Sequence, residues 1–146
     1  MANETWKPVV GYEGLYEVSN LGRVRSIPRP RAKGGIRKPS VRHNGYLYLP
    51  LQQKQNKKQA LVHRLVAEAF LGPQPSDRHR VTHINGQRQD NRLANLAWRV
   101  WLVSREDVDR AAELQRAGMS IRKIADKIGI RYGTIAKHLA ARAKGQ

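Results

Sequence analysis

Tight-turn signals recur at short intervals in the first 60 residues, and they limit this part of the chain to short strands. Asn and Gly adopt the positive φ angles of hairpin turns, and apolar residues that alternate with polar ones are typical of half-buried strands. Tyr16 with Val18 and Tyr46 with Tyr48 are such alternations. The turn signals between the apolar runs are Asn20–Leu21–Gly22, Gly34–Gly35 and Asn44–Gly45. The pattern predicts a β-rich module over residues 1–60.

This first module is strongly basic. The whole chain has 28 Lys and Arg against 11 Asp and Glu, a formal charge of +17, and no acid stands between Glu17 and Glu68. Such an excess favours a polyanionic partner, DNA or RNA before a membrane, because each neutralised phosphate releases condensed counterions. The alternative is a basic surface with no defined register on nucleic acid. The cations expected to contact DNA are Arg23, Arg25, Arg29, Arg31, Lys33, Arg37 and Lys38.

Other features of composition exclude several classes. The chain has no Cys, which excludes a disulfide framework, Cys-ligated zinc and a thiol nucleophile. No run of about eighteen apolar residues could span a bilayer, and the first ten residues lack the order of a signal peptide. We therefore expect no membrane partner and a location in the cytoplasm of a bacterial cell, either a phage-infected cell or the host. The sequence names no protein partner.

The middle of the chain, residues 61–101, predicts a helix followed by a polar loop. Residues 61–72 carry apolar side chains at helical spacing and end at Gly72–Pro73. Val81–Ile84 then predicts a short strand that contains His83, and the Asn-Gly pair after it is a strong turn signal. A histidine that is tied to Asn side chains here could simply satisfy a polar turn.

The last segment, residues 102–146, predicts three helices. Ser104 and Ser120 are good N-caps, and Gly129 favours a turn between the second and third helices. This spacing is typical of a helix-turn-helix, whose last helix enters a DNA major groove, although a generic three-helix bundle fits the same periodicity. The residues expected to reach DNA are Arg131, Tyr132, Thr134, Lys137, His138 and Arg142.

These motifs together resemble one family. "WKPVVGYEGLYEVSNLGRVRSI" resembles the N-terminal module of phage homing endonucleases, and "VHRLVAEAFLGPQPSDRHRVTHINGQRQDNRLANLAW" is similar to their HNH segment. A C-terminal helix-turn-helix is also common in them. The resemblance implies an α+β fold built from a β-rich module, a ββα-metal unit and a three-helix module. It also implies Mg²⁺-dependent (or Mn²⁺-dependent) cutting or nicking of double-stranded DNA.

The resemblance assigns roles to several residues. His83 matches the general base that takes a proton from the attacking water, and Asn95 matches the asparagine that ties down the loop and orients that base. A cation is needed because the anionic phosphodiester repels a nucleophile. Thr82 stands where the family usually has an Asp or Asn ligand, and Ser104 stands where its second ligand is expected. Positions whose role is implied to be structural are His63, Arg64, Gly86, Asn91, Leu96 and Trp98.

Two functions therefore remain open from the sequence. One is a divalent-metal-dependent endonuclease or nickase in which Thr82 and an unassigned acid hold the cation. Asp90 lies in the loop and Asp107 further along the chain, but neither matches the family pattern by position. The other is a catalytically inactive protein on the same scaffold, which binds DNA or an enzyme acting on DNA without cleaving it. RNA binding is the weaker third alternative, because the deep, narrow major groove of A-form RNA does not admit a recognition helix.

Overall fold

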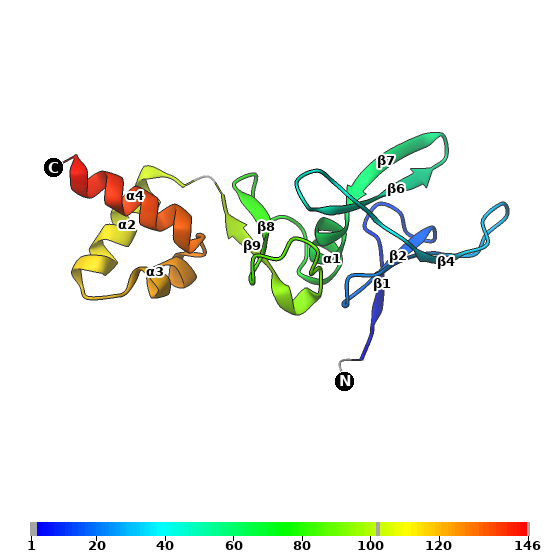
Figure 1. Ribbon diagram of the computed structural model, residues 1–146, viewed down its shortest axis with the longest axis horizontal. Helices are drawn as coiled ribbons and strands as arrows, with labels where there is room; N and C mark the ends of the chain where they lie inside the picture. The colour runs from blue at the N-terminus through cyan, green and yellow to red at the C-terminus, as the bar shows by residue number, and fades with distance from the viewer. Residues whose placement is uncertain (1–2, 102, 146) are drawn as a thin grey trace. The chain divides into compact units, whose positions relative to one another are not determined.

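The computed structural model describes residues 3–101 and 103–145. It contains both strands and helices, which confirms the α+β class, and its contacts form two compact units (Figure 1). The first unit comprises Met1–Pro73 with Val81–Ala97, and the second comprises Gln74–Arg80 with Trp98–Gln146. Residue 102, where the third predicted module begins, lies outside the described residues. The division into three modules therefore stays a prediction.

The chain begins with a four-stranded antiparallel sheet in which the strands follow chain order. Alternate residues of a strand share one face, and Tyr16, Val18 and Val24 are accordingly buried together. Glu17 and Arg25 alternate with them and pair across the sheet. The strands are β1 (Trp6–Pro8), β2 (Tyr16–Ser19), β3 (Val24–Ser26) and β4 (Gly35–Arg37).

A second, three-stranded sheet and one helix complete the body of this unit. The helix α1 (Val62–Phe70) lies within the predicted span 61–72 and contacts both sheets. Its apolar face packs on Leu49 and Leu51, which point inward from the second sheet. The strands of this sheet are β5 (Ser40–Val41), β6 (Leu47–Gln53) and β7 (Asn56–Leu61), of which the last two form a long hairpin. The buried core comprises Val9, Tyr16, Val18, Val24, Leu49, Leu51, Val62, Leu65, Val66 and Leu96.

After α1 the chain forms a small two-stranded sheet that brackets the Asn-rich segment. The strands are β8 (His79–His83) and β9 (Leu96–Val100). The loop between them, residues 84–95, ends in a short 3-10 helix, η1 (Leu93–Asn95). We call residues 84–95 the His83 loop.

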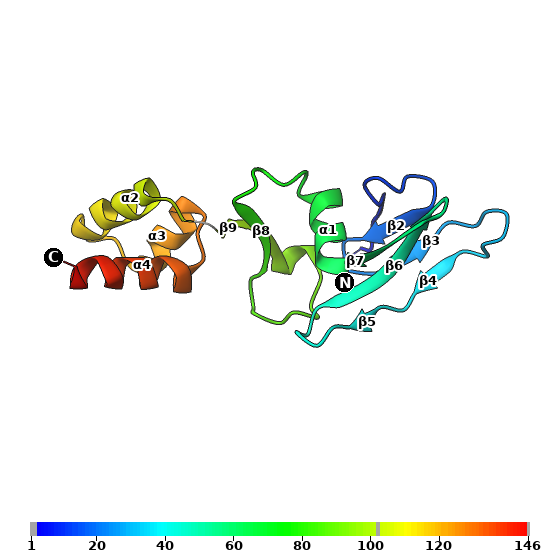
Figure 2. The same cartoon turned by 90° about the horizontal axis from the view of Figure 1, so that it is seen from above.

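The second unit contains three helices, α2 (Arg105–Arg116), α3 (Ile121–Ile128) and α4 (Tyr132–Lys144) (Figure 2). Ser104 is the N-cap of α2 and Ser120 that of α3, as predicted, and Gly129 ends α3 with a left-handed φ of 77°. No helix in the described part of the chain is long and apolar enough to cross a membrane. The buried residues between the helices are Ala111, Ile124, Ala125, Ile130, Ile135 and Leu139.

Candidate functional site

His83 ends β8 and is only 8% exposed. The loop that follows is closed by Asn95, whose side chain bonds to the opposite side of the loop. Asn95 Oδ1 accepts from the Asn85 amide N at 2.9 Å, and Asn95 Nδ2 donates to Asn85 Oδ1 at 2.9 Å and to Asp90 O at 2.8 Å. Asn95 therefore fixes the path of the His83 loop through three hydrogen bonds.

The direct partner of the His83 ring is Asn91. His83 Nε2 lies 2.8 Å from Asn91 Oδ1, and both residues are buried. An amide oxygen only accepts, so with the amide in this orientation Nε2 carries the proton and Nδ1 keeps a free lone pair. The resemblance implied that Asn95 orients the histidine and that Asn91 is structural. In the structure Asn91 contacts the ring, whereas Asn95 holds the loop.

Two further aromatic rings lie close to the His83 ring. His63 from α1 lies with its ring centroid 5.1 Å from that of His83, and the Tyr46 centroid lies 4.9 Å from His63 and 5.8 Å from His83. Burial, with smaller contributions from the nearby charges of His83 and Arg64, lowers the pKa of His63 to about 4. His63 is therefore neutral at cellular pH. Sequence reasoning did not find Tyr46, because nothing in the local pattern links it to a histidine 37 positions later.

The described side chains do not form a complete metal-binding set. Within residues 3–101 and 103–145, no group of three or more His, Asp or Glu residues is arranged to hold a metal ion. Thr82 is half-buried next to His83 and offers one hydroxyl oxygen. A divalent cation such as Mg²⁺ prefers carboxylate oxygens along with water and substrate phosphates, so a single hydroxyl is a weak protein ligand.

The acids considered as additional ligands are already engaged. Asp90 accepts three hydrogen bonds from Arg92, two from the guanidinium and one from the backbone N, and one from Asn85, and these bonds hold the pKa of its carboxyl well below the usual range. Asp107, in the second unit, bonds to the N-cap Ser104 and pairs with Arg78. The side chain of Ser104 is occupied by the same cap.

The seven cations of the first module that were predicted to contact DNA fall into two groups. Arg23 pairs with Glu4, Arg25 pairs with Glu17 and stacks on Trp6, and Arg29 donates to three oxygens inside the module. These arginines help to hold the sheet together. The others are exposed and form no ion pair among the described residues: Arg31, Lys33, Arg37 and Lys38.

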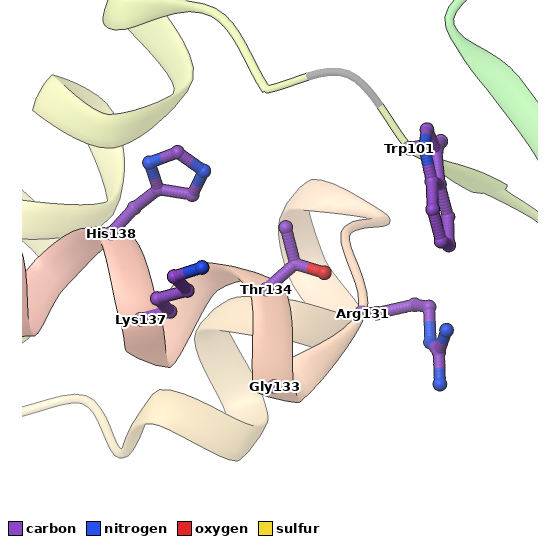
Figure 3. Close-up of a pocket in the computed structure, with 6 residues that line it drawn as sticks. All are labelled: Trp101, Arg131, Gly133, Thr134, Lys137 and His138. Carbon is purple, nitrogen blue, oxygen red and sulfur yellow. The ribbon is translucent and has the colours of Figure 1, made fainter.

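Four of the six predicted DNA-contacting residues of the second unit lie in the first two turns of α4 or at its N-cap: Arg131, Thr134, Lys137 and His138. They line a hollow of about 440 Å³ together with the exposed Trp101, over whose ring the Arg131 guanidinium lies at 6.0 Å (Figure 3). Arg142, by contrast, pairs with Asp109 of α2. Tyr132 is exposed at the first turn of the helix. The other residues that line the hollow are Gly133, Thr134, Lys137 and His138.

Two further positions with implied structural roles are Gly86, within the His83 loop, and Trp98, in the strand that follows it. Gly86 has φ of 77°, a left-handed value that glycine adopts without strain, and its amide N donates to His83 O at 3.1 Å. Trp98 lies half-buried in β9.

Two family models match the chain, a NUMOD4 motif over residues 4–52 and an HNH endonuclease over residues 60–107. An uncharacterised HNH endonuclease of Acanthamoeba polyphaga mimivirus is 35% identical over 84% of this chain and 29% of its own length. The DNA endonuclease I-HmuI of Bacillus phage SP01 is 37% identical over 64% of this chain and 51% of its own length. The chain thus spans about half or less of these curated relatives.

A solved structure agrees with the sequence matches. The structure describing DNA binding and cleavage by the HNH homing endonuclease I-HmuI matches with a TM-score of 0.58 and 30% identity. The match covers 84% of this chain and 66% of that one. It therefore extends beyond either of the two matched family segments taken alone.

Proposed function

Because this chain belongs to the HNH endonuclease family, we propose that it binds double-stranded DNA and hydrolyses a phosphodiester bond at His83. The observation that carries the proposal is the buried His83 ring, which is held by Asn91 through Nε2 and leaves Nδ1 as a proton acceptor. I-HmuI is described as binding and cleaving DNA, and this supports the same substrate here. The Bacillus phage relative supports action in a bacterial cytoplasm.

The chemistry assigned to the protein's own groups is proton transfer. A water that attacks phosphorus becomes a stronger nucleophile as it loses a proton, and a positioned imidazole can accept that proton. Asn91 keeps the ring in one tautomer and orientation, because its amide oxygen accepts a hydrogen bond from Nε2–H both before and after Nδ1 takes the proton of the water. Neutral His63 adds no positive charge next to the base.

HNH endonucleases generally use a divalent metal ion. For this chain we propose Mg²⁺ or Mn²⁺, with the Thr82 hydroxyl as the ligand from the protein. The ion would neutralise phosphate charge in the transition state. Because Thr82 brings no negative charge, we expect a higher metal requirement than a carboxylate at this position would give.

Binding to DNA is assigned to exposed cations and to α4. The exposed first-unit cations would contact phosphates without reading sequence. We propose that α3 and α4 act as a helix-turn-helix, in which Lys137 contacts a phosphate. Base contacts would come from Arg131, Tyr132, Thr134 and His138.

A specific observation favours a second candidate, a DNA-binding protein that no longer cleaves. Asp90, Ser104 and Asp107 all use their side-chain oxygens in hydrogen bonds and ion pairs, and the position before His83 lacks a carboxylate. A protein that kept the His83 loop but lost its metal ligands would retain its fold and its binding to DNA.

Nicking of supercoiled plasmid in Mg²⁺ or Mn²⁺ separates the two candidates. We expect the wild-type protein to convert supercoiled to open-circular DNA, His83→Ala to lose this activity by a factor of about 10² or more, and the exposed-histidine control His43→Ala to retain it. Thr82→Asp should lower the metal concentration needed for half-maximal nicking. Salt-sensitive DNA binding without nicking would instead establish the non-cleaving protein, most clearly if Thr82→Asp restored cleavage.

A further inference from the structure

The turn between β2 and β3 touches the His83 loop closely at one point. The Leu93 amide N donates to Asn20 O at 2.8 Å, so the loop and the turn share a backbone hydrogen bond. Beside it, a Cβ built on Gly22 would lie 2.9 Å from both the backbone C and O of Asn91. A glycine is therefore required here by the close approach of Asn91, the residue that holds His83.

A second turn, between β5 and β6, contacts the opposite part of the same loop. Arg88 of the loop donates from Nη1 to Asn44 O, and its guanidinium lies 5.0 Å from the centroid of the Tyr46 ring. Gly45 lies next to the Arg88 side chain, since a Cβ built on Gly45 would be 3.6 Å from Arg88 Cδ. The Tyr46 ring also lies next to the rings of His63 and His83.

We propose that these two turns, residues 20–22 and 44–46, position His83 for catalysis, so that the NUMOD4 segment completes the HNH site in addition to any contact with DNA. The catalytic part of this inference rests on the proposed function. Gly22 and Tyr46 are the principal positioning residues, one acting through Asn91 and the other directly on the histidine rings.

The composition of the loop explains why it needs outside support. Within residues 84–95 the side chains are mostly polar, and Ile84 is 59% exposed, so little apolar burial offsets the entropy of ordering the loop. A base that is misplaced by about 1 Å can lose a factor of about 10² in rate. The two turns hold the loop at Arg88 on one side and at Asn91 and Leu93 on the other.

Glycine variants provide the sharpest test because the chain contains a matched control. Gly22 and Gly14 both have positive φ, 85° and 78°, but a Cβ on Gly14 would meet nothing within 4 Å. Gly22→Ala and Gly14→Ala thus impose similar backbone strain, and only Gly22→Ala pushes on Asn91. In the full chain, we expect Gly22→Ala to raise amide hydrogen exchange across residues 84–95 by tenfold or more, and Gly14→Ala to leave this exchange within twofold of wild type.

Tyrosine variants test the second turn. Tyr46→Ala should lower kcat for plasmid nicking by about tenfold without changing KM, and Tyr46→Phe should restore kcat because the ring, not the hydroxyl, contacts the histidines. Tyr48→Ala is the control, since Tyr48 stands two residues later and its ring lies against Arg42 instead. Tyr46→Ala should also shift the His83 and His63 imidazole resonances, a readout that needs no cleavage.

The outcomes distinguish this inference from the proposed function. If the wild type does not nick DNA but Gly22→Ala loosens residues 84–95 and Tyr46→Ala shifts the imidazole resonances, the endonuclease proposal fails and the positioning role stands. Equal exchange in Gly22→Ala and Gly14→Ala would overturn the role of the first turn. Unchanged imidazole resonances and unchanged kcat in Tyr46→Ala would overturn that of the second.

Discussion

His83 and Lys137 are both proposed to act on DNA, yet their surroundings differ. His83 is 8% exposed and bonds to Asn91, with the rings of His63 and Tyr46 beside it. Lys137 stands exposed on α4 at the edge of the hollow that Trp101 also lines (Figure 3).

The difference separates the effects that substitutions should have. A buried polar group that loses its partner costs about 1–3 kcal/mol, so changes around His83 should reduce stability together with activity. An exposed cation has no such partner to leave behind, and its removal should reduce DNA binding alone.

The largest effect on stability is expected from the protonation of His63. Its pKa is lowered to about 4 in the fold, so between pH 6.5 and 4 the unfolded chain binds a proton that the folded chain does not. The free energy of unfolding should therefore fall as the pH falls through this window, by a total on the order of 3 kcal/mol. Urea denaturation at several pH values measures it.

The control for this effect is His63→Phe, which keeps a ring in the same place but cannot titrate. The difference in unfolding free energy between wild type and variant isolates the histidine from carboxylates that titrate near the lower end of the range. If the difference in unfolding free energy between wild type and His63→Phe stayed constant from pH 6.5 to 4, the fold would not lower the pKa of His63.

The next effect concerns Asn95. Asn95→Ala removes the three part-buried side-chain hydrogen bonds that close the His83 loop, each worth about 1 kcal/mol, so the free energy of unfolding should fall by about 2–3 kcal/mol. Gln89→Ala removes an exposed amide from the same loop and should change it by less than about 0.5 kcal/mol. Equal stability of the two variants in urea would place the support of the loop elsewhere.

Local signals in the sequence were enough to predict most of the helices. The caps Ser104 and Ser120 and the turn at Gly129 act within a few residues of themselves, and each is found as predicted. The pairing of the candidate base was harder to predict, because three Asn residues follow His83 within twelve positions and all can accept a hydrogen bond. In the fold, Asn91 packs against Gly22 and bonds to the His83 ring.

Long-range contacts explain the rest of what the sequence did not reveal. Charge alone treats the arginines of the first module as equivalent, but Arg29 is turned inward and Arg37 outward. Tyr46 joins His63 and His83 only after two sheets and a helix have packed together. Periodicity and spacing contain no information on either arrangement.

A third prediction uses that pair of arginines. Arg29 Nη1 donates to Leu15 O, Ser26 Oγ and Ile27 O at 3.0–3.2 Å, so Arg29→Ala should lower the free energy of unfolding by about 1–2 kcal/mol. Arg37→Ala should leave stability unchanged and weaken DNA binding severalfold at low salt. Denaturation and fluorescence anisotropy on the same two proteins check both halves. The reverse assignment, with Arg37 affecting stability and Arg29 only binding, would contradict the structure.

The smallest effect is expected on α4, where Lys137 and Arg142 can be compared directly. Lys137 is exposed, so Lys137→Ala should reduce the slope of log affinity against log salt concentration by about 1, as the loss of one phosphate contact does. Arg142 is already paired with Asp109, so Arg142→Ala should change that slope less and cost at most about 1 kcal/mol of stability. Anisotropy titrations with duplex DNA at four salt concentrations measure both slopes. If Arg142→Ala reduced the slope as much as Lys137→Ala, the Arg142–Asp109 ion pair would have to open on DNA. The contrast between cations held in ion pairs and exposed cations would then not hold in the second unit.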